Sequence, residues 1–372
     1  MKILLVIPTL DSSGAEKQFS LLATGLPRDK FDVQTVALTR GGPYAAMLKE
    51  HDIPLTILNK RFKLDPFVLY RLRKIIQQQQ PDIIHSWLFA ANAYTRLVTQ
   101  KTSDTKKNAA KMIVSERCVD TWKSGWQLKL DRKQIDKTTM LIGNSQPVVD
   151  FYRTLGYPAE KTTVIHNGIA LPENQLQTQQ RDAMLAQLDL PSGARIVGFV
   201  GRLAPQKKVK DLIWAMQLLR QLSQNTYFLI VGDGEQRHML EEATRHFNCE
   251  PFCRFVGHRD DATSLIPLMN VFWLASDFEG LSNSLMEAMA AGVPAVVSDI
   301  PPNRELVTDG ETGFFVKPGD SVGFAQFADR IIADEALAKK LGDASIQRMK
   351  EHFSIKQMID AHAKLYHEVV NH

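Results

Sequence analysis

Two successive series of short β-branched runs, separated by amphipathic stretches, constrain the fold of this chain of 372 residues more than any other feature. In the first series we expect strands at 3–7, 31–38, 53–58, 82–85, 111–115, 139–143 and 162–165. After residue 194 the alternation starts again, with strands at 196–200 and 227–231 and a helix near 211–222 between them. Short buried strands that alternate with helices indicate βαβ units and parallel sheets. The sequence therefore predicts an α/β protein with two Rossmann-like, doubly wound domains.

The composition between the two series places the domain boundary. Residues 171–194 contain two prolines, a glutamine-rich polar tract and a glycine, which is typical of a linker followed by one helix. We expect an N-terminal domain at 1–170 and a C-terminal domain at 195–354. The last segment, 355–372, is amphipathic and needs an apolar surface to cover.

Composition and cysteine usage exclude several classes of protein. Apolar residues make up 44% of the chain and charged residues 23%, as in soluble globular proteins. Cys118, Cys249 and Cys253 are too few for a disulfide framework, and no second Cys or His pair accompanies them for zinc. The apolar run at 3–7 has no cleavage site behind it, and no uncharged stretch of about 18 residues exists. We expect a cytosolic protein without a bound metal.

The charge is distributed unevenly along the chain. Residues 1–168 hold 25 Lys and Arg against 15 Asp and Glu, a net charge of +10, whereas the remainder has a net charge of −6. Either the two surfaces simply differ, or the first half meets an anionic partner. No aromatic-interleaved basic motif is present, so we do not expect nucleic-acid binding.

The positive charge is densest in residues 60–74. The segment combines cationic and apolar residues, namely Lys60, Arg61, Lys63, Arg71, Arg73 and Lys74 with Phe62, Leu64, Phe67 and Leu72. Such a mixture is found in peripheral segments at anionic membrane surfaces. The alternative is an ordinary amphipathic helix that packs on its own domain.

Open parallel sheets bind ligands beyond the carboxyl ends of their strands, and two such domains predict a cleft between them. Gly14 follows the strand at 3–7 and precedes a helix, so backbone amides there can approach a phosphate. The Gly-x-Gly-x-x-Gly fingerprint is missing, and Gly14 can equally be a turn glycine. His85 stands at the carboxyl end of the strand at 82–85, either at the cleft or as a buried histidine with satisfied hydrogen bonds.

The loop after the strand at 196–200 carries two cations close to a glycine. Gly201 is followed by Arg202, and Lys207 comes five residues later. An Arg offers a bidentate fork and a Lys a compact charge, so the two side chains suit a diphosphate. The alternative is an exposed basic loop.

The strongest group of residues follows the predicted strand at 271–274. Glu279 stands before a short apolar helix, where a carboxylate can accept hydrogen bonds from sugar hydroxyls. Residues at the helix start can offer backbone amides to a diphosphate, namely Gly280, Leu281, Ser282, Asn283 and Ser284. Glu287 lies within the helix among Ala, Met and Leu, and an enclosed carboxylate needs partners such as ribose hydroxyls.

Together these motifs resemble the retaining glycosyltransferases of family 4, which have the two-domain GT-B fold. The resemblance covers nearly the whole chain and rests on Ser13-Gly14-Ala15-Glu16, Asn167-Gly168-Ile169, Gly201-Arg202-Leu203 with Lys207, Val231-Gly232-Asp233-Gly234, Thr308-Asp309-Gly310-Glu311-Thr312-Gly313, and the pair Glu279 and Glu287. It implies that the helix at 355–372 crosses back onto the first domain.

The resemblance also implies roles for individual residues. Arg202 and Lys207 would contact the donor diphosphate, with Gly14 close to the phosphates. Glu279 would contact the donor sugar, and Glu287 would hold the ribose. We therefore expect Arg202, Lys207 and Glu279 to be the catalytic residues, because charge on the leaving diphosphate must be stabilised.

This chain departs from the family pattern at three positions, of which Ser13, in place of the family's first N-terminal glycine, is a small change. Lys208 stands where members usually have glycine, and Arg117 stands where many members have a histidine that contacts the donor sugar. His85 and Arg117 are therefore candidates for contacts with the sugar or the acceptor.

The resemblance implies a reaction as well as a fold. A sugar would move from a nucleotide diphosphate donor to a glycan or lipid-linked acceptor of the cell envelope, with retained configuration. No Asp-x-Asp pair stands at a strand end, so we expect neither a metal ion nor a cofactor. The alternatives are a sugar-nucleotide epimerase of the same fold and a non-catalytic nucleotide-sugar binding module.

Overall fold

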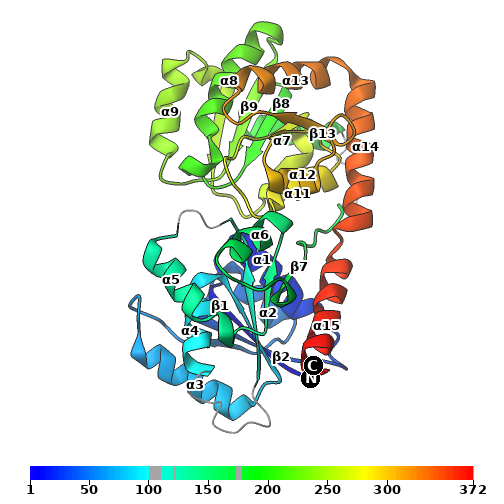
Figure 1. Ribbon diagram of the computed structural model, residues 1–372. Coiled ribbons are helices and arrows are strands. Elements are labelled where there is room, and N and C mark those ends of the chain that lie inside the picture. The colour runs from blue at the N-terminus through cyan, green and yellow to red at the C-terminus, as the bar shows by residue number, and fades with distance from the viewer. Residues whose placement is uncertain (100–109, 120–122, 173–177, 372) are drawn as a thin grey trace. The chain divides into compact units, whose positions relative to one another are not determined.

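The computed structural model describes residues 1–99, 110–119, 123–172 and 178–371, which form two compact units (Figure 1). The first unit consists of Met1–Gly168 together with the segment that begins at Ile355, and the second is Ile169–Ser354. Each unit contains one parallel sheet with alternating helices. The structure thus confirms the predicted α/β class.

The first unit is built on a seven-stranded sheet with the strand order β3-β2-β1-β4-β5-β6-β7. Its strands are β1 (Lys2–Thr9), β2 (Asp32–Arg40), β3 (Leu55–Ile57), β4 (Ile83–Trp87), β5 (Lys111–Glu116), β6 (Met140–Gly143) and β7 (Thr162–Val164). Its helices are α1 (Gly14–Gly25), α2 (Pro43–Glu50), α3 (Pro66–Gln79), α4 (Leu88–Thr99), α5 (Gly125–Lys133), α6 (Gln146–Thr154) and α15 (Ile355–Asn371). All seven strands predicted for this unit are confirmed.

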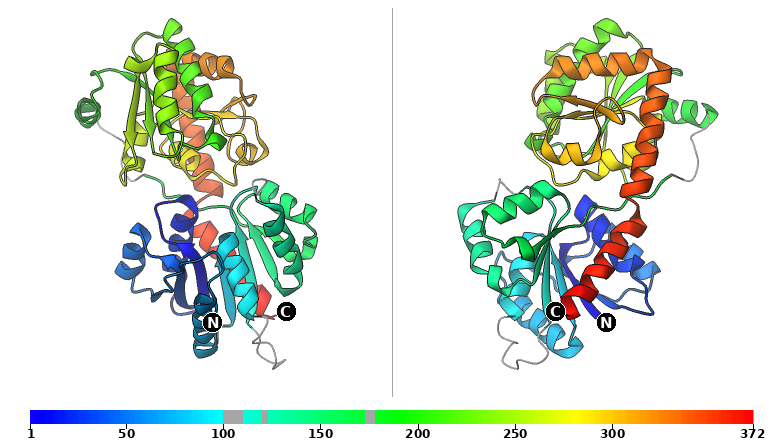
Figure 2. Two further views of the ribbon diagram at one scale, coloured as in Figure 1. Left: turned by 90° about the vertical axis from the view of Figure 1, so that its left-hand side faces the viewer. Right: turned by 45° about the vertical axis from the view of Figure 1, so that its right-hand side comes forward.

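Helices cover both faces of the first sheet because its inner strand β1 is apolar on both sides. Along β1, Ile3 and Leu5 belong to one buried cluster, whereas Leu4 and Val6 belong to another. Side chains alternate across a strand, so a continuous apolar run requires cover on both faces. Helix α15 supplies part of the cover on the Ile3 face, where Tyr366 is fully buried (Figure 2).

The second unit is built on a six-stranded sheet with the order β10-β9-β8-β11-β12-β13. Its strands are β8 (Arg195–Val200), β9 (Thr226–Val231), β10 (Cys253–Gly257), β11 (Val271–Leu274), β12 (Ala295–Ser298) and β13 (Gly313–Val316). Its helices are α7 (Thr178–Gln187), α8 (Val209–Leu222), α9 (Arg237–His246), α10 (Ala262–Leu265), α11 (Asn283–Ala290), α12 (Pro301–Leu306), α13 (Ser321–Ala333) and α14 (Glu335–His352).

The segment predicted as a linker, 171–194, contains helix α7. Residues 173–177 lie outside the described residues. The end of α7 is anchored in the core of the second unit, because Leu185 is fully buried there and Leu190 is nearly so. In the described part of the chain, no helix combines the length and the apolarity that a membrane crossing requires.

Candidate functional site

The strand order of the second sheet changes direction between β8 and β11. These two strands are neighbours, although β9 and β10 stand between them in the sequence. Crevices for ligands form where the strand order reverses, beyond the carboxyl ends of the strands. The loop after β8 carries Arg202 and Lys207, and the loop after β11 carries Glu279. The fold therefore brings the two motif loops to the same position.

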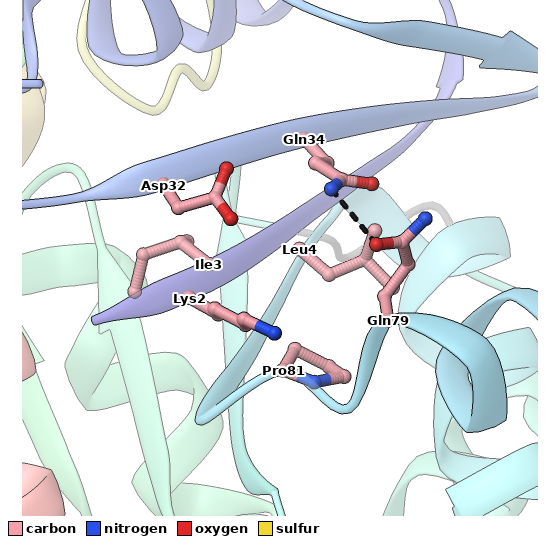
Figure 3. Close-up of a pocket in the computed structure, with 7 residues that line it drawn as sticks. All are labelled: Lys2, Ile3, Leu4, Asp32, Gln34, Gln79 and Pro81. Carbon is pink, nitrogen blue, oxygen red and sulfur yellow. Dashed lines mark hydrogen bonds between the residues drawn. The ribbon is translucent and has the colours of Figure 1, made fainter.

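The first unit has a small hollow at the amino-terminal edge of its own sheet (Figure 3). Lys2 and Asp32, which begin β1 and β2, line it, and Gln34 Nε2 donates a hydrogen bond of 2.8 Å to Gln79 Oε1 there. Because this is the amino-terminal edge of the strands, it is not where an open parallel sheet binds its ligand.

Four polar contacts join the two motif loops of the second unit. The Asp277 amide donates to Gln206 O at 3.0 Å, and Gln206 Nε2 donates to Phe278 O at 2.7 Å. Lys207 Nζ lies 2.5 Å from Glu279 Oε1, and Lys208 Nζ lies 3.1 Å from Asp277 Oδ2. We call residues 206–208 and 277–279 the loop clasp. The clasp fixes the position of Lys207 relative to Glu279.

Glu279 is almost enclosed, with 6% of its surface exposed. Its Oε1 accepts hydrogen bonds from Lys207 Nζ and, at 2.6 Å, from Ser276 Oγ. Those two donors offset the cost of burying the carboxylate. Its Oε2 accepts no hydrogen bond from a described residue and is not sealed from solvent. The carboxylate thus keeps one oxygen that can accept a hydrogen bond from a hydroxyl group.

Arg202 lies on the same loop as Lys207 but is exposed. Its guanidinium has no ion pair or hydrogen bond with any described residue. The loop backbone is nevertheless fixed, because the Gly201 amide donates to Val231 O at 3.0 Å and the Leu203 amide donates to Asp233 O at 2.9 Å. Arg202 is therefore a cation without a carboxylate partner, held on an ordered loop.

The two glycines of the motif at 231–234 allow its backbone to lie close to the backbone of the loop at 201–203. Gly232 has a φ of +132°, and a Cβ there would lie 2.0 Å from Gly201 O. A Cβ on Gly234 would lie 2.4 Å from Leu203 O. Any side chain at these positions would displace the loop that carries Arg202.

The remaining residues predicted to bind the sugar donor lie in helix α11 or directly before it. Gly280, Leu281 and Ser282 are buried ahead of the helix, and Ser282 is its N-cap, with Oγ accepting from the Leu285 amide at 3.4 Å. Within α11 only three residues are not buried, namely Asn283, Ser284 and Glu287. Their spacing of three and four residues places them on one side of the helix. The first turn also carries the positive end of the helix dipole.

His85 lies in the core of the first unit, with none of its surface exposed. Its Nδ1 is 2.6 Å from Tyr366 Oη, and its Nε2 is 2.7 Å from Ser115 Oγ. Burial is the main cause that holds the pKa of His85 well below its ordinary value. The geometry favours the alternative interpretation of the sequence, a buried histidine with satisfied hydrogen bonds, over a ligand contact.

Arg117 follows β5 and is nearly buried against an aromatic ring. Its guanidinium lies 3.6 Å from the centroid of Trp87, and Nη1 donates to Asn167 Oδ1 at 3.2 Å. Nε and Nη2 are enclosed without a partner among the described residues. Burial lowers the pKa of Arg117 to about 9. Gly14, the third candidate in this unit, is exposed at the first position of α1.

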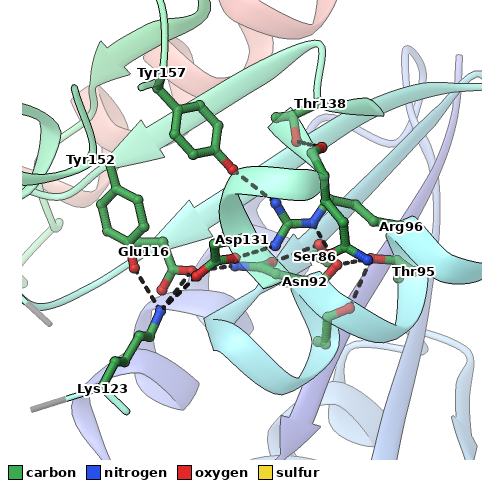
Figure 4. A network of polar contacts seen from close by, with 12 residues as sticks. Ser86, Asn92, Thr95, Arg96, Glu116, Lys123, Asp131, Thr138, Tyr152 and Tyr157 are labelled. Carbon is green, nitrogen blue, oxygen red and sulfur yellow. Dashed lines mark hydrogen bonds and ion pairs between the residues drawn. The ribbon is translucent and has the colours of Figure 1, made fainter. Parts of the chain in front are cut away.

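The first unit also contains a buried network of charges that the sequence did not predict (Figure 4). One of its members is Glu116, the residue before Arg117. Arg96 Nη2 lies 2.5 Å from Asp131 Oδ1, and Lys123 Nζ lies 3.4 Å from both Asp131 Oδ2 and Glu116 Oε1. Two cations and two carboxylates compensate one another, which makes their burial tolerable. The signal in the sequence is Arg96, a lone cation in the apolar helix at 88–99, which requires a partner.

Each half of the chain matches the sequence model of a known protein family. Residues 12–172 match the family model described as Glycosyltransferase Family 4, and residues 180–348 match the one described as Glycosyl transferases group 1. The chain belongs to the group 1 glycosyltransferases. The family resemblance predicted from the motifs is thus confirmed.

Two relatives of this glycosyltransferase are named for the biosynthesis of lipopolysaccharide core and of capsular polysaccharide. It is 31% identical over 180 residues to the lipopolysaccharide core biosynthesis glycosyltransferase LpsE of Rhizobium meliloti, covering 48% of this chain. It is 28% identical over 189 residues, 50% of this chain, to the capsular polysaccharide biosynthesis glycosyltransferase CapM of Staphylococcus aureus. The match spans only about half the length of these two relatives, 52% and 49%.

A solved structure shares the fold of this glycosyltransferase over its whole length. Anabaena HepE, crystallised in complex with UDP-glucose, superposes with a TM-score of 0.87 at 21% identity, covering 99% of this chain and 100% of HepE. This likeness confirms the predicted GT-B fold.

Proposed function

We propose that this protein transfers a sugar from a nucleotide diphosphate donor to a glycan or lipid-linked acceptor, with retained anomeric configuration, in the synthesis of a cell-envelope polysaccharide. The observation that carries the proposal is the ion pair between Lys207 and Glu279 at the switch point of the second sheet. The names of LpsE and CapM support the polysaccharide pathway, and the complex of HepE supports a nucleotide-sugar donor.

The diphosphate would bind between the exposed guanidinium of Arg202, the ammonium of Lys207 and the start of α11. Departure of the sugar concentrates negative charge on the diphosphate. Fixed cations and helix amides aimed at that charge stabilise the transition state more than the ground state. Because the loop clasp positions Lys207 before the donor arrives, little reorganisation is needed.

The sugar and the ribose would be held by two different carboxylates. Glu279 keeps Oε2 for a sugar hydroxyl while Oε1 stays on Ser276 and Lys207. Glu287 shares the accessible face of α11 with Asn283 and Ser284, one turn from the helix start. A diphosphate at that start would bring its ribose near Glu287, which matches the role that the family resemblance gives to this residue.

The reaction would require no metal ion, because Arg202, Lys207 and the start of α11 already supply positive charge to the diphosphate. The test is a panel of nucleotide sugars, in which thermal shift finds the donor and chromatography follows nucleoside diphosphate release with and without EDTA. We expect stabilisation by one nucleotide diphosphate and its sugar, since a bound donor raises the free energy of unfolding. We also expect release that persists in EDTA.

Three outcomes would contradict parts of this proposal. Stabilisation by no nucleotide diphosphate would remove the donor site. Conversion of the nucleotide sugar to its epimer without an acceptor would favour the epimerase alternative, and binding without any turnover would favour the binding module. Loss of release in EDTA, restored by a divalent ion, would show that a metal takes part.

A further inference from the structure

The loop before α3 and the outer side of α3 carry large apolar side chains in water. Phe62 and Leu64 are each 65% exposed, Phe67 is 73% exposed and Tyr70 is 68% exposed. They alternate with the six cations of the segment, Lys60, Arg61, Lys63, Arg71, Arg73 and Lys74. We call these ten residues the α3 patch. Soluble proteins rarely leave neighbouring large apolar side chains exposed without a binding role.

The packing of α3 on its own domain does not account for the patch. Val68, Leu72 and Ile76 bury one face of the helix in the core of the first unit. Phe67 and Tyr70 lie on another face, in a stripe with Arg71 and Lys74 at spacings of three and four residues. The structure therefore confirms the packing of an amphipathic helix on its own domain, and it leaves the opposite side of α3 exposed.

The backbone beneath the patch is held firmly, so the side chains are presented rather than loose. Asp65 is buried and accepts hydrogen bonds from the amides of Arg61 at 3.0 Å and Phe67 at 3.1 Å. The Asp65 amide donates to Tyr94 Oη at 2.6 Å, and that hydroxyl donates to Lys63 O at 3.1 Å. The loop is thus fixed to α4, which packs beside α3 (Figure 1).

The positive charge of the patch is not neutralised locally. Asp65 is the one carboxylate in residues 60–74, and its side chain faces inward to cap α3. Among the described residues, none of the six cations forms a salt bridge. Arg71 Nη1 donates a hydrogen bond of 3.4 Å to Leu58 O, which is a neutral acceptor.

We propose that the α3 patch binds the surface of an anionic lipid bilayer. Phe62, Leu64 and Phe67 would enter the headgroup boundary while the cations pair with lipid phosphates. A bilayer surface supplies apolar depth and negative charge over the same area, which is the combination that this patch displays. The inference does not rest on the proposed transfer reaction, because binding is measured without a sugar donor.

The test is sedimentation of the full chain with phosphatidylcholine vesicles, with or without phosphatidylglycerol, at low and physiological salt. We expect binding only with phosphatidylglycerol, and weaker binding as salt rises. Arg71→Glu with Lys74→Glu should lower the partition coefficient at least about tenfold, since each cation near the surface adds about 1 kcal/mol. Phe62→Ser with Phe67→Ser should also weaken binding at both salt concentrations.

Matched controls carry the same chemical changes at exposed positions outside the patch. Lys340→Glu with Lys350→Glu makes the same change in charge, and Leu222→Ser with Val322→Ser removes two other exposed apolar side chains. Circular dichroism establishes that every variant folds. Wild-type protein that stays in the supernatant with phosphatidylglycerol, or patch variants that bind no worse than the controls, would overturn the proposal. If the protein bound pure phosphatidylcholine vesicles as well as vesicles with phosphatidylglycerol, the proposed requirement for an anionic lipid would be wrong.

Discussion

The ammonium of Lys207 lies 2.5 Å from the carboxylate of Glu279, although 72 residues separate them in the sequence. The cation that we assign to the donor diphosphate therefore rests on the carboxylate that we assign to the donor sugar. Each of the two residues is in place before the donor binds, and each depends on the other for a partner.

Removing the charge of Lys207 should slow the reaction strongly. We expect Lys207→Ala to lower kcat/KM by roughly 10²–10³, as for other losses of a preorganised charge that stabilises a leaving group. Arg202→Ala should act in the same direction. Lys210→Ala removes an exposed cation one turn away and is the control. Steady-state kinetics with the donor found by thermal shift measures the effect, and near wild-type values for Lys207→Ala would contradict the assignment.

The two carboxylates should separate nucleotide affinity from turnover. Glu287→Gln should weaken binding of the free nucleoside diphosphate in calorimetry, because it alters the ribose contact. Glu279→Gln should leave that affinity nearly unchanged and lower kcat, because its partner is the sugar. If calorimetry and kinetics gave the reverse pattern, the roles of the two residues would be exchanged.

Lys208 should be a strained position. Its φ of 50° lies in the left-handed region, which explains why glycine is usual at this place in the family. Lys208→Gly should therefore be more stable than Lys208→Ala by about 1 kcal/mol, since both lose the ion pair with Asp277 and only glycine relieves the strain. Chemical denaturation measures the difference. Equal stability of the two variants would show that the backbone relaxes.

Buried histidines should make the first unit sensitive to acid. Burial, with a further contribution from Arg117, lowers the pKa of His362 to about 3, and His85 is held well below its ordinary value of 6.5. At His362 the unfolded chain therefore binds more protons than the folded chain between about pH 3 and pH 6.5. The contribution of His362 to stability is complete above that range and falls as the pH decreases, by about 1.4 kcal/mol per pH unit. His85 acts in the same direction.

The variant His362→Leu isolates this effect. The free energy of unfolding of the variant, followed by denaturant titration at several pH values, should depend less steeply on pH below 6.5 than that of the wild type. Identical slopes would mean that His362 takes up its proton at the same pH in the folded protein as in the unfolded chain.

The sequence by itself determined the strands, the doubly wound class and the loops that carry the site. These features are encoded locally, because a buried parallel strand is a continuous apolar run and ligand loops follow its end. The same local pattern placed Arg202, Lys207 and Glu279 after β8 and β11, and it placed Glu287 within α11.

Only the tertiary structure decided which side chains meet. His85 is a core residue because Tyr366, 281 residues further along the chain, arrives on α15 to satisfy its Nδ1. Arg96 can be buried because Asp131, 35 residues further along the chain, supplies its carboxylate partner. The outward face of α3 is exposed because Val68 and Leu72 fill the inward face. Periodicity fixes the direction of a side chain relative to its own element, whereas its partner depends on which distant element packs there.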